Sequence, residues 1–95
     1  MSPGRISSML EALLDPLAAI EHERWAHWQS YMHRKAVRQP DGSLLLPAAL
    51  VSQWERQIST PFEGLSEEEK DSDRDQVRKY LPLIESTLKR EMTRT

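Results

Sequence analysis

Three charged residues that stand close together in the sequence, Lys70, Asp73 and Arg74, have the chemistry to bind an anionic ligand. An ammonium and a guanidinium are cationic hydrogen-bond donors, and a neighbouring carboxylate can orient one of them. On a helix, residues three and four positions apart share a face. The spacing is therefore consistent with the charged floor of a polar pocket. The alternative is a helix whose first turns extend past the core into water, where charged residues are ordinarily found.

The helix that carries these residues has a clear start signal. Ser66, followed three residues later by Glu69, forms a capping box, so the helix is predicted to begin at Glu67. Glutamates in the first turn also suit the positive end of the helix dipole. Upstream, Pro61 holds the preceding residue extended and Gly64 supplies a flexible joint.

We expect this helix to continue to about Arg90. Its apolar residues recur at spacings of three and four, which is typical of a helix packed on a core, and they are Val77, Leu81, Ile84 and Leu88. Pro82 cannot donate to the carbonyl of Arg78, so a kink is predicted there.

A second long helix is predicted from Pro16 to about Arg38, because Asp15 followed by Pro16 is a typical helix start. A short amphipathic helix from Ile6 to Leu14 precedes it, and the sequence leaves open whether the two form one bent helix. Along the long helix a stripe recurs at helical spacing, comprising Leu17, Ile20 or Glu21, Trp25, Trp28 and Met32.

Trp25, Trp28 and His22 each have two interpretations. A three-residue step between tryptophans on an apolar face is ordinary core packing, and a platform for a ligand is the alternative. A histidine on such a helix is either a buried imidazole with a hydrogen-bond partner or a contact to a ligand.

Between the two long helices the composition predicts a turn, an extended segment and a third helix. Gln39 to Ser43 has the residues of a turn, and Leu44 to Leu46 is short and apolar. The third helix starts at Pro47 or Ala48 and runs to about Ser59, and its inward residues are expected to be Leu50, Val51, Trp54 and Ile58. The predicted fold is all-α, a small single-domain helical bundle of residues 1–95 with two long helices, one or two shorter ones, and frayed ends at 1–5 and 91–95. The two long helices are expected to pack on each other.

Composition excludes several classes of protein. With 95 residues, 29% of them charged and 38% hydrophobic, the chain suits one modest core and contains no apolar run that approaches a membrane span. It has no cysteine and no secretory signal, so we expect a cytoplasmic protein. The net charge is −2 and the two signs alternate, whereas a nucleic-acid surface is strongly basic. We therefore expect neither a membrane nor nucleic acid as partner.

The chain also lacks the patterns of a metal site or an active site. His22 and Glu23 begin like the zinc motif HExxH, but position 26 is Ala26 and the next histidine is His27, which lies on a different face. No serine stands in a histidine motif and no glycine-rich phosphate loop is present. We expect no metal, no cofactor and no catalysis.

Two stretches together resemble the RyR repeat domain, a module named after ryanodine receptors and also found in bacterial and phage proteins. The family has a helix with His, two residues and Trp, which this chain matches as His22-Glu23-Arg24-Trp25. Its second half reads Pro-aromatic, acidic, Leu, then a polar run with Lys and Asp-Arg, matched by the run from Pro61-Phe62 to Asp73-Arg74. The resemblance covers Leu17 to Ile84. This chain departs from the family after the first helix, where Tyr31 to Arg34 leads into a longer insert instead of an Arg and a Gly-Trp pair.

The resemblance implies a non-catalytic module that binds a small nucleotide-like ligand, because RyR repeats are associated with nucleotides or nucleotide-derived ligands. Prokaryotic members are linked to signalling in bacteria–phage conflict, which implies a sensor or a sequestering protein in bacterial or phage signalling. The expected ligand-binding residues are His22, Trp25, Pro61, Phe62, Lys70, Asp73 and Arg74. The alternative is a small structural or adaptor protein that binds a protein partner, or a homo-oligomer with Trp28 or Trp54 at the interface.

Overall fold

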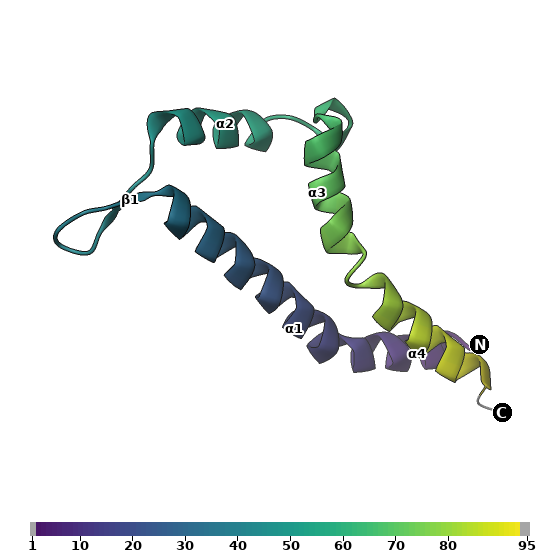
Figure 1. The fold of residues 1–95 in the computed structure, drawn as a ribbon. Helices are drawn as coiled ribbons and strands as arrows, with labels where there is room; N and C mark the ends of the chain where they lie inside the picture. Colours follow the sequence, from purple (N-terminus) through teal and green to yellow (C-terminus); the bar gives the residue numbers. More distant parts are fainter. Residues whose placement is uncertain (1, 94–95) are drawn as a thin grey trace. The chain divides into compact units, whose positions relative to one another are not determined.

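A computed structural model describes residues 2–93, which form four α-helices and one short hairpin (Figure 1). The order is α1 (Pro3–Lys35), β1 (Val37–Arg38), β2 (Leu44–Leu45), α2 (Ala48–Ile58), the 3₁₀ turn η1 (Phe62–Gly64), α3 (Glu67–Val77) and α4 (Leu81–Thr93). The predicted all-α class is confirmed.

The chain divides into two compact units. One comprises Met1–Arg24 and Asp73–Thr95, and the other comprises Trp25–Ser72, so that α1 and α3 each contribute to both. That the chain is one domain stays a prediction. Residues 3–5 and 91–93 are helical, contrary to the predicted fraying, whereas residues 1, 94 and 95 lie outside the described part of the chain.

The first helix is continuous through Pro16, which answers the question of one helix or two. Pro16 has no N–H to donate to the carbonyl of Ala12, and α1 bends within its purple to blue part in Figure 1. The helix ends at Lys35 and not at Arg38, because Arg38 and its neighbour Val37 pair with the second strand instead.

The predicted single helix from Glu67 to Arg90 is wrong, because residues 78–80 interrupt it. The backbone N–H groups of Lys79 and Tyr80 donate to carbonyls three residues back, which tightens and ends α3. Pro82 then falls in the first turn of α4, where a missing N–H is tolerated. The proline therefore starts a new helix instead of kinking an old one.

In the first unit, α1 lies antiparallel to α4. The Arg5 guanidinium meets the Glu91 carboxylate at 2.8 Å, and further along the Tyr80 hydroxyl donates to Glu21. Sequence numbers thus rise along α1 as they fall along the other segment. Among its described residues, the buried side chains are Met9, Leu13 and Thr87, which are called the seam below.

The predicted inward stripe of the C-terminal region is not the buried one. Val77, Leu81 and Leu88 are exposed, and Ile84 is half-buried. Thr87 is buried in their place, with its hydroxyl donating to the carbonyl of Leu83 at 2.9 Å. The predicted apolar stripe of α4 therefore lies beside the buried Thr87 and is not itself the buried side of the helix.

In the second unit, the hairpin pairs Val37 with Leu45 and Arg38 with Leu44 in antiparallel register. Its turn is held by the Asp41 carboxylate, which accepts from the backbone N–H of Ser43 at 2.9 Å and from its hydroxyl at 2.6 Å. The turn prediction and the extended leucines are confirmed, whereas the pairing with Val37 and Arg38 was not predicted.

The third helix begins and ends within a residue of its predicted bounds. Leu50, Val51 and Trp54 are half-buried, as expected of inward residues. Ile58 is exposed, so its prediction as an inward residue is wrong. It is the last residue of the helix, and the chain turns away there.

Candidate functional site

The structure distributes the seven predicted ligand-binding residues over both units. His22, Asp73 and Arg74 belong to the first, and the second contains Trp25, Pro61, Phe62 and Lys70. That all seven converge on one ligand stays a prediction. Within the second unit, two of them do come together.

Phe62 and Lys70 form a cation–π pair. The Lys70 ammonium lies 5.7 Å from the centroid of the Phe62 ring, within the range of such interactions. The ring is 43% exposed, whereas the Lys70 side chain is only 18% exposed. An exposed aromatic ring and a cationic group thus lie next to each other.

Local backbone geometry places Phe62 opposite α3. Pro61 is extended, with φ −61° and ψ 155°, and the next three residues form one 3₁₀ turn. Leu65 is extended again, with φ −73° and ψ 157°, and leads into the cap of α3. Gly64 suits this turn, because a Cβ there would lie 3.1 Å from the Thr60 methyl group, which would have to shift by a few tenths of an ångström.

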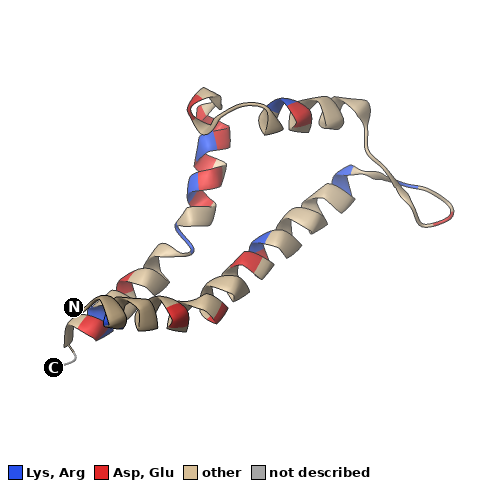
Figure 2. Ribbon diagram, turned by 180° about the vertical axis from the view of Figure 1, so that it is seen from behind, with Lys and Arg blue, Asp and Glu red and all other residues tan. Residues whose placement is uncertain are grey.

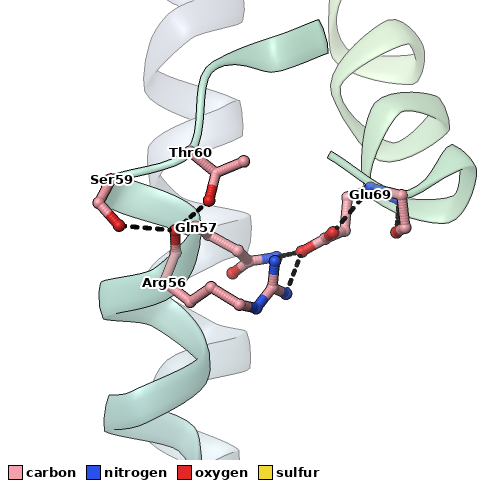
Figure 3. Close-up of polar contacts among 6 residues, drawn as sticks. Arg56, Gln57, Ser59, Thr60 and Glu69 are labelled. Carbon is pink, nitrogen blue, oxygen red and sulfur yellow. Dashed lines mark hydrogen bonds and ion pairs between the residues drawn. The ribbon is translucent and has the colours of Figure 1, made fainter. Parts of the chain in front are cut away.

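A polar clamp, defined as Arg56, Gln57, Ser66 and Glu69, joins the end of α2 to the start of α3 (Figure 3). Arg56 meets one carboxylate oxygen of Glu69 at 2.8 Å, and the Gln57 amide donates to the same oxygen. The other oxygen accepts the backbone N–H of Ser66 at 3.0 Å, while the Ser66 hydroxyl accepts the Glu69 N–H at 3.2 Å.

This arrangement confirms the predicted capping box and adds two partners that were not predicted. Arg56 and Gln57 are 13 and 12 residues from Glu69, a separation at which a local sequence pattern carries no signal. The clamp fixes both ends of the loop that carries Phe62. It also holds the pKa of Glu69 down at about 2, chiefly through the Ser66 N–H and then through Arg56 and Gln57.

The last turn of α2 is closed by its own hydroxyl groups. Ser59 and Thr60 both donate to the carbonyl of Arg56, at 3.1 Å and 2.5 Å, as Figure 3 shows. Arg56 is therefore held by hydrogen bonds at its backbone carbonyl and by the ion pair with Glu69 at its guanidinium. The chain reverses direction here without leaving this carbonyl unsatisfied.

The helix α3 is strongly acidic, with six acidic and two basic residues among its 11 (Figure 2). Several of these carboxylates have cationic or N–H partners. Glu67 lies 3.5 Å from the Lys70 ammonium, Asp75 meets Arg78 at 2.6 Å, and Glu69 is in the clamp. These carboxylates are therefore partly neutralised, and Glu67 in turn partly neutralises the Lys70 ammonium.

An aromatic cluster lies elsewhere in the second unit. Trp28 stacks on Tyr31 with ring centroids 5.5 Å apart, and it meets Trp54 edge-on at 5.4 Å. Lys35 lies 5.6 Å from the centroid of the Tyr31 ring. Trp25 and Trp28 are both exposed, so neither is the fully buried core residue that its spacing favours.

In the first unit, Glu21 connects α1 to the segment before α4. Its carboxylate accepts from Arg24 and from the Tyr80 hydroxyl, and these two bonds lower the pKa of Glu21 to about 2. The hydrogen bond to Glu21 raises the pKa of Tyr80, because the carboxylate favours the protonated phenol. Tyr80 was not singled out in the sequence, since its partner is 59 residues away.

No family model, curated protein or solved structure matches this chain. Within residues 2–93, no group of three or more His, Asp or Glu side chains is placed to hold a metal ion. None of the helices described there is long and apolar enough to cross a membrane.

Proposed function

We propose that this protein is a non-catalytic binding module for a small nucleotide-like ligand, acting as a sensor or sequestering protein in bacterial or phage signalling. The observation that carries the proposal is the pairing of an exposed Phe62 ring with the Lys70 ammonium. Base stacking on an aromatic side chain contributes about 1–3 kcal/mol, and it tolerates different bases. A phosphate oxygen accepts from the ammonium beside it.

The loop geometry supports this role because it holds the ring in place before a ligand arrives. The clamp ties both flanks of the loop, and Pro61 restricts its entry. Preorganisation of this kind favours binding, because the loop loses less conformational entropy when a ligand binds. Glu69, the carboxylate next to Lys70 in sequence, is engaged by its own donors.

Four further residues are proposed as ligand contacts from the sequence resemblance. Arg74 follows Lys70 by four residues on α3, and its guanidinium offers a fork that matches a phosphate. Asp73 would orient a cationic side chain or a ribose hydroxyl. His22 and Trp25 on α1 complete the proposed set.

A thermal-shift screen against mononucleotides, cyclic dinucleotides and ADP-ribose tests the proposal. A ligand that binds only the folded protein raises its melting temperature, and about 2.7 kcal/mol of stabilisation accompanies a concentration 100 times the Kd. We expect at least one of these compounds to shift the melting curve at micromolar concentration. A flat response across the whole panel would contradict ligand binding.

Variants then locate the site by calorimetric titration of the ligand found. Lys70→Ala should weaken binding by roughly tenfold or more, because a charge-assisted contact contributes about 1.5–3 kcal/mol. Arg74→Ala should weaken it further, since the fork makes two contacts. The matched control is Lys35→Ala, which removes an ammonium from the Tyr31 ring and should leave affinity unchanged. Equal losses in Lys35→Ala and Lys70→Ala would place the ligand elsewhere.

Protein binding through the aromatic cluster is a second candidate function. The observation that favours it is the exposure of Trp25 and of Trp28, which stacks on Tyr31, since interfaces are enriched in Trp and Tyr. In that case Trp28→Ala would abolish capture of the partner while Lys70→Ala would not.

A further inference from the structure

The charges around the Phe62 and Lys70 pair restrict the nucleotide-like ligands that can bind there. The Lys70 ammonium lies 5.7 Å from the centroid of the Phe62 ring and 3.5 Å from the Glu67 carboxylate. The Glu67 side chain is 75% exposed, so a ligand that contacts the ammonium comes close to this carboxylate as well. The positive charge that Lys70 offers to a ligand is therefore already partly offset.

The chain on both sides of this pair is strongly acidic. Residues 56–72 of the second unit contain two basic and five acidic side chains, which gives a net charge of −3; the acidic ones are Glu63, Glu67, Glu68, Glu69 and Asp71. Arg56, one of the two basic residues, is engaged by Glu69 at 2.8 Å. Extending the count to the end of α3 adds Arg74 together with Asp73 and Asp75, and the net charge becomes −4 (Figure 2).

Attraction to Lys70 and repulsion from these carboxylates depend differently on the number of phosphates. A first phosphate in contact with the ammonium gains a charge-assisted hydrogen bond, and at contact distance this gain outweighs repulsion from carboxylates further away. A second or third phosphate extends beyond the ammonium and meets the net negative field, which acts over about 8 Å at physiological salt. Each phosphate after the first therefore lowers the affinity.

We propose that the Phe62 and Lys70 site selects nucleotides with a single negative charge, the chemical class of the cyclic mononucleotides, over nucleoside di- and triphosphates. A cyclic mononucleotide has one phosphodiester charge for Lys70 and a base that can stack on Phe62. A phosphate monoester suits the site less, because it carries a charge of about −1.5 to −2 at pH 7. This inference rests on the proposed function, since it names the class of ligand bound at the same site.

Calorimetric titration with a series of adenine compounds tests the inference, because the base stays constant while the charge varies. The probes are adenosine, cyclic AMP, AMP, ADP and ATP, without divalent cations, which would neutralise the polyphosphates. We expect cyclic AMP to bind about tenfold more tightly than adenosine, through the contact with Lys70. ATP should bind about tenfold or more weakly than cyclic AMP, and the difference should grow as the salt concentration is lowered.

Charge-removing variants locate the source of this selectivity. Glu67→Gln should narrow the ratio of the ATP and cyclic AMP dissociation constants by about threefold, because the carboxylate closest to Lys70 is lost. Glu63→Gln, next to Phe62 in η1, should narrow the ratio as well and replaces the first variant if Glu67→Gln does not fold. The matched control is Asp41→Asn, which removes the same charge from the hairpin beyond the opposite end of α2, a helix about 16 Å long (Figure 1). It should leave the ratio unchanged.

Failure of this inference can be told apart from failure of the proposed function. If ATP binds as tightly as cyclic AMP, the charge selectivity is wrong and nucleotide binding stands. If no compound of the adenine series binds, this inference is wrong, and the proposed function fails only when the whole thermal-shift panel is flat. A ratio that changes as much in Asp41→Asn as in Glu67→Gln would also overturn the inference, because the charge of the whole chain and not that of the site would then decide.

Discussion

Different forces stabilise the interior of each of the two units of this chain. In the first, the side chains of the seam are buried: Met9 and Leu13 on α1 and Thr87 on α4. In the second, no residue is buried among residues 25–72, and the contacts are directional: the polar clamp on Glu69 and the ring contacts of Trp28. The stability of the first unit therefore depends on buried apolar area, and that of the second on the geometry of its hydrogen bonds and ring contacts.

This difference matters for what each unit can do. Directional bonds hold the loop that carries Phe62 without covering its ring, which is what a ligand platform needs. The first unit depends instead on the apolar area that Met9 and Leu13 bury, and leucines such as Leu14 add little to it because they are exposed. Substitutions in the two units should accordingly differ in size and in their response to pH.

The largest effect is expected in the seam of the first unit. Leu13 is 5% exposed, so Leu13→Ala removes a buried side chain and leaves a cavity. The expected loss is about 2–5 kcal/mol in the free energy of unfolding, measured by urea titration. Leu45→Ala in the exposed second strand is the control, with an expected loss below about 1 kcal/mol. Equal losses in the two variants would mean that the seam is not the main apolar contact.

A smaller effect is expected in the aromatic cluster of the second unit. Trp28→Ala removes the stack on Tyr31 and the edge contact with Trp54. Each such pair contributes about 0.5–1.5 kcal/mol beyond area burial, so we expect a loss of about 1–3 kcal/mol by urea titration. A loss as large as that of Leu13→Ala would contradict the contrast between the units, because it would make the cluster a second apolar core.

The parts of the fold that the sequence predicts are those that local bonds decide. Ser66 and Glu69 are three residues apart and bond to each other, so the start of α3 can be predicted from residue types alone. The turn at Asp41 is equally local, since Ser43 is its partner. The same holds for α2, whose apolar residues recur at helical spacing.

The parts that could not be predicted depend on distant partners. Nothing near Glu69 in sequence indicates Arg56, and nothing near Tyr80 indicates Glu21. The break before Pro82 also has no unique local signal, because a proline can kink a helix or begin one. Which of several adjacent apolar positions is buried depends on the partner helix, and for that reason Thr87 and not Leu88 lies in the seam.

The smallest effect, and the one that separates the units most directly, is the response to acid. The pKa values of Glu69 and Glu21 are both lowered from 4.5 to about 2. Below its ordinary pKa the unfolded chain binds a proton that the folded chain does not yet bind, so stability is lost as pH falls from about 4.5 toward 2.

All three tryptophans lie in the second unit, so their fluorescence reports on that unit alone. Glu69→Gln should flatten the acid dependence of tryptophan emission, and Glu21→Gln should flatten only that of far-ultraviolet circular dichroism. If Glu21→Gln changes the tryptophan curve as much as Glu69→Gln does, the two units unfold as one, and the contrast between them describes only their contacts and not their stability.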